Sequence, residues 1–476
     1  MNLHLNFGSV IPQLILLILF LVQLIVDAFS KTKGKKSFIG YMSLTVYAVI
    51  MAISILSWGV KEVGFNGMVV YDSFTQFFNL LFAIIASLII LISPKYMDDQ
   101  GRDRGEFYSL ITASFLGMSL MVATTNLIIF LIALEIMSLS IYVLAGFEKE
   151  KARSTEAAFK YFILGGVASG IFLFGISLLY ASTATVDIAK IGVMGDYKFL
   201  SIIGIVMILT GFLFKIAAVP FHMWTPDTYE GAPTPIAAYM AVGVKAAAFA
   251  GLIRILTVSL NSFNDEIEIV IWVIALLTMF TGNILAVIQS NIKRVLAYSS
   301  IAHAGYMLLG IIAYKNNGLS AVLYYLVVYA FADIGAFSIL IALGKDGKAV
   351  ETFEDIKGKA LQHPLLGVSM LIFMFSLAGI PPFAGFIGKF FLFKSAIGAG
   401  YIYLSVLGIL TSVFAVYYYL KVLIYMYMYP IEDNAKEPVN ISVAIGLTIM
   451  TVGVLVLGLL PGRYIDIAVS AIKYIF

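Results

Sequence analysis

Seven charged side chains stand inside stretches of the sequence that are otherwise apolar. They are Glu135, Lys160, Lys215, Lys245, Asp333, Lys389 and Lys421. On insertion scales a lysine or aspartate at the centre of a membrane helix costs roughly 2.5 to 3.5 kcal/mol, so such residues mark ion pathways by default. Removal from water also brings the titration of lysine and glutamate closer to neutral pH. Because a proton carrier must gain and lose its proton near neutral pH, this set predicts a proton pathway.

Each residue also has a simpler explanation. A structural ion pair would account for Lys215, Lys245 or Lys389 taken singly, and a hydrogen bond between packed helices for Asp333. Lys421 lies in an aromatic run at 417–429. A side chain that extends to the membrane surface, or a structural contact, would explain this lysine as well as a role in transport does. Nearer the helix ends, Arg254 and Lys394 are expected to reach an interface and Asp27 to mark the end of the first helix. The three lysines together favour function.

Prolines stand beside two of these lysines. Lys215 precedes Pro220, and Lys389 follows Pro381 and Pro382. Proline removes a backbone donor and breaks the helical ladder, and the freed carbonyl groups are tolerated at membrane depth where they are buried in protein or line a watery cavity. The pattern predicts two broken helices, the seventh and the twelfth, each beside an ion site. The simpler alternative is that the prolines only kink the helices for packing.

Histidine supplies two more candidates. His303 lies inside an apolar stretch, and its ordinary titration range suits a proton relay, although a lone buried histidine is often just hydrogen-bonded. His222 follows Pro220 and is expected to cap freed backbone groups. With four histidines and no cysteine, a thiolate site is excluded and a multi-histidine metal centre is not expected.

The elements that must position these groups are membrane helices. The chain has 476 residues, 61% hydrophobic and 12% charged, whereas a soluble domain has about 25% charged residues. Spans of about 20 apolar residues are needed to cross a bilayer. We expect an all-α polytopic membrane protein in one integral domain, residues 1–476, with about fourteen helices near 9–29, 37–58, 73–93, 106–124, 126–147, 157–181, 199–219, 234–257, 267–289, 294–313, 321–343, 365–393, 401–428 and 440–460.

The two proline breaks are about five helices apart. A second copy of a five-helix unit enters the membrane upside down, and transporters often place ion sites at the break points of such inverted repeats. The spacing predicts a first repeat at about 106–257 and a second at about 267–428. Helices 1–3, at about 9–93, and helix 14, at about 440–460, lie outside the repeats.

Basic residues in the loops predict the orientation. With fourteen helices, seventeen of the 30 lysine and arginine residues fall in loops on one side and six on the other. Cytoplasmic loops carry the excess of basic residues, so both termini are expected on the outer side. The net charge of +3 is too small to suggest nucleic acid as a partner.

Five stretches carry a family resemblance that covers essentially the whole chain. They are Ala-Leu-Glu-Ile-Met-Ser-Leu at 133–139, Glu-Ala-Ala-Phe-Lys-Tyr-Phe at 156–162, Pro-Phe-His-Met-Trp-Thr-Pro-Asp-Thr-Tyr-Glu-Gly-Ala-Pro-Thr-Pro at 220–235, Tyr-Ser-Ser-Ile-Ala-His-Ala-Gly-Tyr at 298–306 and Gly-Ile-Pro-Pro-Phe-Ala-Gly-Phe-Ile-Gly-Lys at 379–389. The chain resembles the antiporter-like subunit N family of respiratory complex I, the proton-pumping NADH–quinone oxidoreductase. Lysine at 389 departs from the similar subunit M, which usually has glutamate there.

The resemblance implies fourteen helices in two inverted five-helix bundles, with helices 7 and 12 broken. It implies that Glu135 pairs with Lys215, that Lys245 is the central relay, and that Lys389 faces the next subunit or the exit. Lys160 and His303 would join the polar axis. No flavin, iron–sulfur cluster, quinone site or metal is implied in this chain, because electron transfer would belong to partner subunits of the membrane complex. Lipid, water and protons are the other partners, in a bacterial inner membrane.

A mechanism follows as a hypothesis. Redox chemistry elsewhere changes the charge next to Glu135, Lys215 loses its stabilisation, and its proton moves through water to Lys245 and then to Lys389. Two unit charges 4 Å apart interact by roughly 4 kcal/mol at an effective dielectric constant of 20, which is large enough for such a transfer.

Three other functions use the same helices. The chain could be a subunit of a cation/proton antiporter, or of the membrane arm of a hydrogenase or of a dehydrogenase with another electron donor. It could also be a passive scaffold, against which the retained buried lysines argue.

Overall fold

The computed structural model describes residues 6–30, 35–191, 197–259, 264–345, 347–430 and 438–473, and most of them are helical. The first half of the chain contains α1 Ile11–Phe29, α2 Ser37–Leu56, α3 Ser73–Asp99, α4 Gly105–Ala123, α5 Leu127–Ala145, α6 Ala152–Thr183 and α7 Lys198–Lys215. The rest contains α8 Trp224–Gly231, α9 Thr234–Tyr239, α10 Lys245–Ser259, α11 Asn264–Val287, α12 Ile292–Ile312, α13 Gly318–Leu343, α14 Lys359–Gln362, α15 Pro364–Ala378, α16 Ala384–Gly398, α17 Ile402–Met428, α18 Ile441–Leu459 and α19 Pro461–Ile472.

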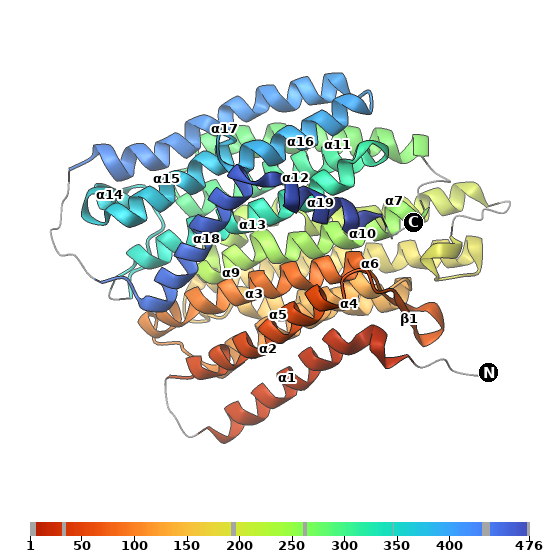
Figure 1. The fold of residues 1–476 in the computed structure, drawn as a ribbon, viewed down its shortest axis with the longest axis horizontal. Coiled ribbons are helices and arrows are strands. Elements are labelled where there is room, and N and C mark those ends of the chain that lie inside the picture. Colours follow the sequence, from red (N-terminus) through yellow and green to blue (C-terminus); the bar gives the residue numbers. More distant parts are fainter. Residues whose placement is uncertain are drawn as a thin grey trace.

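These helices form a membrane-spanning bundle. Within the described ranges, thirteen helices are long and apolar enough to cross a bilayer, or fourteen if the pair Glu354–Gln362 and Pro364–Ala378, bent by 116°, counts as one span. The prediction of about fourteen spans is therefore confirmed. The long helices run side by side, with α1 and α2 at one edge and α17 at the other (Figure 1). The grouping into two inverted repeats stays a prediction.

Burial separates the core helices from those that face lipid. The segments α9–α10 and α12 are almost wholly buried, whereas α1, α6 and α17 expose large apolar side chains such as Leu17, Phe159 and Val413. Water would make such a surface unstable, and lipid makes it favourable. The polar candidates therefore have to be sought in the core helices.

The first interruption lies between α7 and α10. Helix α7 ends at Lys215, and the chain then passes through Ala217, at φ +60°, before α8 begins. Val219 donates its N–H to Thr278 Oγ1 of α11 at 3.0 Å, so a backbone group outside the helical ladder has a partner. A short π-helical turn, Met240–Val244, joins α9 to α10.

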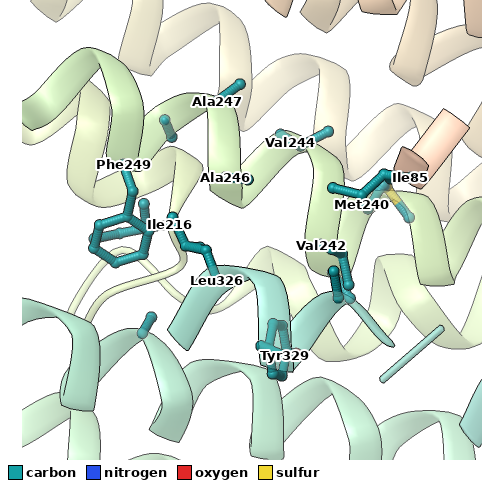
Figure 2. Packing of buried hydrophobic residues seen from close by; sticks show 14 of the residues in the cluster. Ile85, Ile216, Met240, Val242, Val244, Ala246, Ala247, Phe249, Leu326 and Tyr329 are labelled. Carbon is teal, nitrogen blue, oxygen red and sulfur yellow. The ribbon is translucent and has the colours of Figure 1, made fainter. Parts of the chain in front are cut away.

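Apolar side chains enclose this interruption. Figure 2 shows Ile216, the residue after α7, beside Phe249 of α10 and Leu326 of α13. On the π-helical turn, Met240 lies next to Ile85 of α3. All of these side chains are buried. The start of the break in α7, at Ile216, is therefore packed in protein, whereas Pro220 and Met223 farther along the same segment are exposed.

The second interruption lies between α15 and α16. Gly379, at φ +84°, ends α15, a backbone conformation that glycine adopts readily. The prolines 381 and 382 follow, and Gly385 in the first turn of α16 donates its N–H to Ser376 Oγ at 3.0 Å. A Cβ at Gly385 would lie 1.7 Å from Ser376 O, so the two helix ends approach as closely as the backbone allows.

Gly385→Ala tests this close approach. We expect a loss of about 1–3 kcal/mol of stability, because an added methyl group at a backbone contact forces the two helices apart. The measurement is the thermal stability of the purified membrane protein. The matched control is Gly166→Ala in α6, where an added Cβ meets nothing within 4 Å. Equal stability of the two variants would contradict the tight packing of this bend.

Two elements were not predicted from the sequence. A two-stranded hairpin, β1 Glu62–Gly64 with β2 Val69–Tyr71, joins α2 to α3. Helix α19 follows α18 directly and packs on α3 and α13. Both are too short to give an apolar run of membrane length.

Candidate functional site

Lys215 is buried at the last residue of α7. Its side chain is 1% exposed, and Nζ donates to Tyr142 Oη of α5 at 3.0 Å. Glu135, two turns earlier on α5, accepts from Ser169 Oγ of α6 and interacts electrostatically with Lys215. Among the described residues the two charges form no ion pair within 4 Å. The predicted partners are thus neighbours across a gap, and a small movement of α5 or α7 changes their interaction.

Lys245 occupies the first position of α10. It is 1% exposed, and Nζ donates to the backbone oxygen of Ser300 at 2.8 Å and to Ser300 Oγ. Asp333 of α13 is fully buried and interacts electrostatically with Lys245. Both carboxylate oxygens of Asp333 lack a hydrogen-bond partner among the described residues. Asp333 therefore lies close enough to Lys245 to act on its charge, and its role, whether relay partner or helix-packing group, stays a prediction.

His303 follows Ser300 by one helical turn on α12. Its Nδ1 is 2.6 Å from Tyr325 Oη of α13, and its Nε2 is 3.0 Å from Tyr419 Oη of α17. Tyr419 also shares a hydrogen bond with Ser299 Oγ. Hydroxyl groups can donate or accept, so both ring nitrogens have partners that suit either tautomer. A proton could enter this imidazole on one nitrogen and leave from the other.

Lys389 lies beside the bend between α15 and α16. Its Nζ donates to the carbonyl oxygens of Leu377 at 2.9 Å and Ala378 at 3.2 Å, which end α15. The ammonium also lies 5.0 Å from the ring centre of Tyr306. The freed carbonyl groups therefore bind a cation, which is the role predicted from Pro381 and Pro382.

A chain of polar side chains joins His303 to Lys389. Tyr418 and Tyr419 are in ring contact, with centres 4.4 Å apart. Tyr418 donates to Asn283 Oδ1 at 3.1 Å, and Asn283 Nδ2 donates to Tyr306 Oη at 2.9 Å. Tyr306 in turn lies under the Lys389 ammonium. These side chains are buried.

Sequence reasoning missed these tyrosines. On α13, Tyr325, Tyr329 and Asp333 recur at intervals of four residues, and on α12 His303 and Tyr306 are three apart. Such spacing places side chains on one face of a helix. A polar stripe on an otherwise apolar helix was therefore the available signal. The run at 417–429 was considered only for Lys421, and its Tyr419 is the residue that contacts His303.

Lys160 belongs to a cluster at the end of the bundle and not to the centre. Its side chain is 39% exposed and pairs with Glu156 at 2.6 Å and with Asp227 of α8 at 2.7 Å. Asp227 also accepts from Arg294 Nη1 at 2.8 Å. Burial alone would raise the pKa of the Asp227 carboxyl, but the hydrogen bonds from Lys160 and Arg294 hold it below its usual value. Glu156, four residues before Lys160, was visible in the sequence, whereas Asp227 lies 67 positions later and no local pattern indicated it.

Arg254 corrects another expectation. It does not reach an interface: it is 4% exposed, and its Nη2 lies 2.9 and 3.1 Å from the two carboxylate oxygens of Asp72. Lys394 is exposed, as expected. Lys421 donates to Gln289 O at 3.2 Å and lies 4.3 Å from the ring centre of Phe353, which is a structural contact.

The remaining sequence candidates lie close to the breaks. Pro220 and His222 are in the segment between α7 and α8, and His222 is 8% exposed. Its Nδ1 has no hydrogen-bond partner among the described residues, but the imidazole interacts with the backbone of Pro220, so the capping of the break stays a prediction. Away from the breaks, Asp27 lies near the end of α1, as expected, and pairs with Lys36 at 2.5 Å.

Comparison with known proteins places this arrangement among membrane ion-translocating subunits. Residues 124–415 match the family described as NADH:quinone oxidoreductase/Mrp antiporter, transmembrane. The chain is 43% identical over 476 residues to NADH-quinone oxidoreductase subunit N of Trichlorobacter lovleyi, covering 99% of this chain and 98% of the relative. It is 38% identical over 454 residues to subunit N of Rhodospirillum rubrum, covering 94% and 92%.

Solved structures show the same fold. A chain of respiratory complex I from Thermus thermophilus has 33% sequence identity and a TM-score of 0.83, over 96% of this chain and 99% of that chain. A chain of the Mrp complex from Dietzia sp. has a TM-score of 0.86 at 20% identity, over 98% and 97%. At that identity the second likeness shows the fold alone.

Proposed function

The chain belongs to the NADH:quinone oxidoreductase/Mrp antiporter family of membrane subunits, as a subunit N, and from this premise we propose that its buried lysines carry the translocated protons. It is a multi-pass integral membrane protein and a proton-translocating subunit of an enzyme complex, NADH–quinone oxidoreductase. The finer proposal is that Glu135, Lys215, Lys245 and Lys389 act in that order.

One observation carries the proposal. Buried polar side chains extend from Lys245 through Ser300 and His303, and then through Tyr419, Tyr418, Asn283 and Tyr306 to Lys389. Part of this series is joined by hydrogen bonds, whereas Tyr419 and Tyr418 are in ring contact and Tyr306 meets Lys389 through its ring. Polar groups in a low-dielectric core are costly to bury, so their retention along one line favours a functional role. Hydroxyl and imidazole groups can pass a proton on by taking one on one side and releasing one on the other.

The first step is electrostatic. At an effective dielectric constant of about 20, unit charges 4 Å apart interact by roughly 4 kcal/mol, and the wider separation of Glu135 and Lys215 gives somewhat less. A change in the charge of Glu135 therefore changes how firmly Lys215 holds its proton. The proton released moves toward Lys245, and the opposing charge of Asp333 helps Lys245 to accept it. No covalent intermediate is required.

The electron-transfer cofactors are assigned to partner subunits. The sequence contains no cysteine, so it offers no thiolate ligands for an iron–sulfur cluster. Flavin, iron–sulfur clusters and quinone would be bound elsewhere in the complex, and this chain would act as its non-redox translocase part. The excess of basic residues in the loops on one side supports a bacterial inner-membrane location with both termini outside.

Lys215→Ala tests the function. In the complex reconstituted into vesicles, we expect NADH-driven proton pumping to fall at least tenfold, because the group that responds to Glu135 is gone. The measurement is the pH change inside the vesicles per NADH oxidised. Lys394→Ala removes an exposed lysine of α16 and serves as the control. Undiminished pumping by Lys215→Ala would overturn the assignment and leave the cation/proton antiporter alternative to be examined.

A further inference from the structure

Three aromatic rings surround the ammonium of Lys215. Its Nζ lies 5.0 Å from the ring centre of Tyr142, 5.4 Å from that of Tyr161 and 5.6 Å from that of Phe214. A cation that lies over a ring face within about 6 Å of the ring centre is attracted by the electrons of that face, most strongly where water is absent. Tyr142 instead meets Nζ with its hydroxyl at 3.0 Å, so Nζ lies at the edge of that ring. All three rings are buried, and they come from α5, α6 and α7.

Lys215 differs in this respect from the other two lysines of the route. Lys245 donates to the backbone oxygen of Ser300, and Lys389 donates to two carbonyl oxygens at the end of α15. The hydrogen bond of Lys215 within the described part of the chain goes to the hydroxyl of Tyr142. The ammonium of Lys389 also lies near one ring, that of Tyr306, but Lys215 has several rings near it and no carbonyl partner among the described residues.

Trp224, the first residue of α8, holds this set of rings together. Its ring stacks on Tyr161, with centres 4.2 Å apart and planes 10° apart. Its indole N–H donates to the backbone oxygen of Phe214 at 3.1 Å. Tyr161 in turn meets Tyr142 edge-on, with centres 4.7 Å apart. The segment after the helix break thus fixes both the rings and the backbone that carries Lys215.

We propose that Tyr142, Tyr161 and Phe214, braced by Trp224, form an aromatic box that keeps Lys215 in its protonated form until Glu135 changes. This proposal rests on the proposed function and adds positioning residues to it. The box supplies a constant part of the stabilisation of the ammonium, and Glu135 supplies the part that varies. A lysine supported by Glu135 alone would release its proton at the first weakening of that contact.

The charged and titratable surroundings of Lys215 are few. Glu135 and Tyr142 face it from α5 and Tyr161 from α6. On α8, Asp227 pairs with Lys160 and Arg294 and so holds α8, with Trp224, in place. The cluster at the end of the bundle is thereby connected to the ring set around Lys215.

A fluorinated phenylalanine series at position 214 separates the charge attraction from packing. Fluorine withdraws electrons from the ring face with little change of shape. In the reconstituted complex, proton pumping per NADH is measured against pH for mono-, di- and trifluorophenylalanine. Pumping is lost above a certain pH, which we call the alkaline limit. We expect this limit to fall as the number of fluorines rises, by roughly half to one pH unit for three fluorines. The matched control is the same series at Phe115, a buried ring of α4 that packs on Tyr47 and Phe82.

Two further variants make the outcome decisive. Tyr161→Leu removes a ring and the surface on which Trp224 stacks, and we expect it to move the alkaline limit further in the same direction. Lys215→Ala, measured in parallel, reports on the proposed function itself. If Lys215→Ala stops pumping while the series at 214 matches the series at 115, the box is overturned and the function stands. If Lys215→Ala pumps normally, the function is overturned and the box goes with it.

Discussion

Lys245→Ala should reduce NADH-driven proton pumping at least tenfold, because it removes the cation between Lys215 and the polar chain that starts at His303. It should also destabilise the protein by about 1–3 kcal/mol, since the buried carboxyl of Asp333 loses its opposing partner. Proton uptake by reconstituted vesicles and thermal unfolding of the purified complex measure the two effects separately.

The double variant Lys245→Ala/Asp333→Asn separates stability from transport. It removes both members of the pair, so we expect it to recover part of the lost stability, because the carboxyl that Lys245 had balanced is gone. Pumping should remain at the level of Lys245→Ala. If the double variant pumps at the parental rate, Lys245 is a structural partner of Asp333 and not a relay.

Asp72→Ala should be the most destabilising change outside the proposed route. Asp72 forms the buried pair with Arg254 and also caps α3 by accepting from the backbone N–H of Thr75 at 2.8 Å. Removing one member of a buried pair costs about 3–5 kcal/mol, and loss of a helix cap adds about 1 kcal/mol. The measurement is the thermal unfolding of the purified protein, or its yield in the membrane if it no longer assembles.

An exposed ion pair provides the comparison for Asp72. Asp98 pairs with Lys35 at 3.2 Å, and the two side chains are 46% and 76% exposed. Asp98→Ala should cost less than about 1 kcal/mol, as exposed pairs do. Similar stability of Asp72→Ala and Asp98→Ala would show that burial adds nothing to the Asp72–Arg254 pair.

Local sequence patterns were enough to predict the spans and the groups that are costly to bury. The apolar runs follow from the thickness of a bilayer, and Lys215, Lys245 and Lys389 were found because each breaks such a run. Pro220 and Pro381 marked the breaks because proline cannot complete the helical ladder. These signals depend on a few neighbouring residues, so they can be recognised without knowledge of how the helices pack.

The partners of those groups depend on packing between distant segments. Arg254 was assigned to an interface because its pairing residue, Asp72, lies 182 positions earlier. His303 and Tyr419 are in contact although they lie 116 positions apart in the sequence, and no local pattern predicts that contact. Lys160 was placed in the centre because its apolar neighbours were visible in the sequence and Asp227 was not. Lys215 drew attention as a charge, whereas the rings around it looked like ordinary core residues.

The central claim is that these buried lysines change protonation while the complex turns over. Infrared difference spectra of the complex, prepared with ¹⁵N-labelled lysine and recorded before and after addition of NADH, detect ammonium groups that gain or lose a proton. The account predicts isotope-sensitive bands that are lost, in part, in each of the variants Lys215→Ala, Lys245→Ala and Lys389→Ala. Spectra that are the same in the three variants as in the parent complex would contradict it.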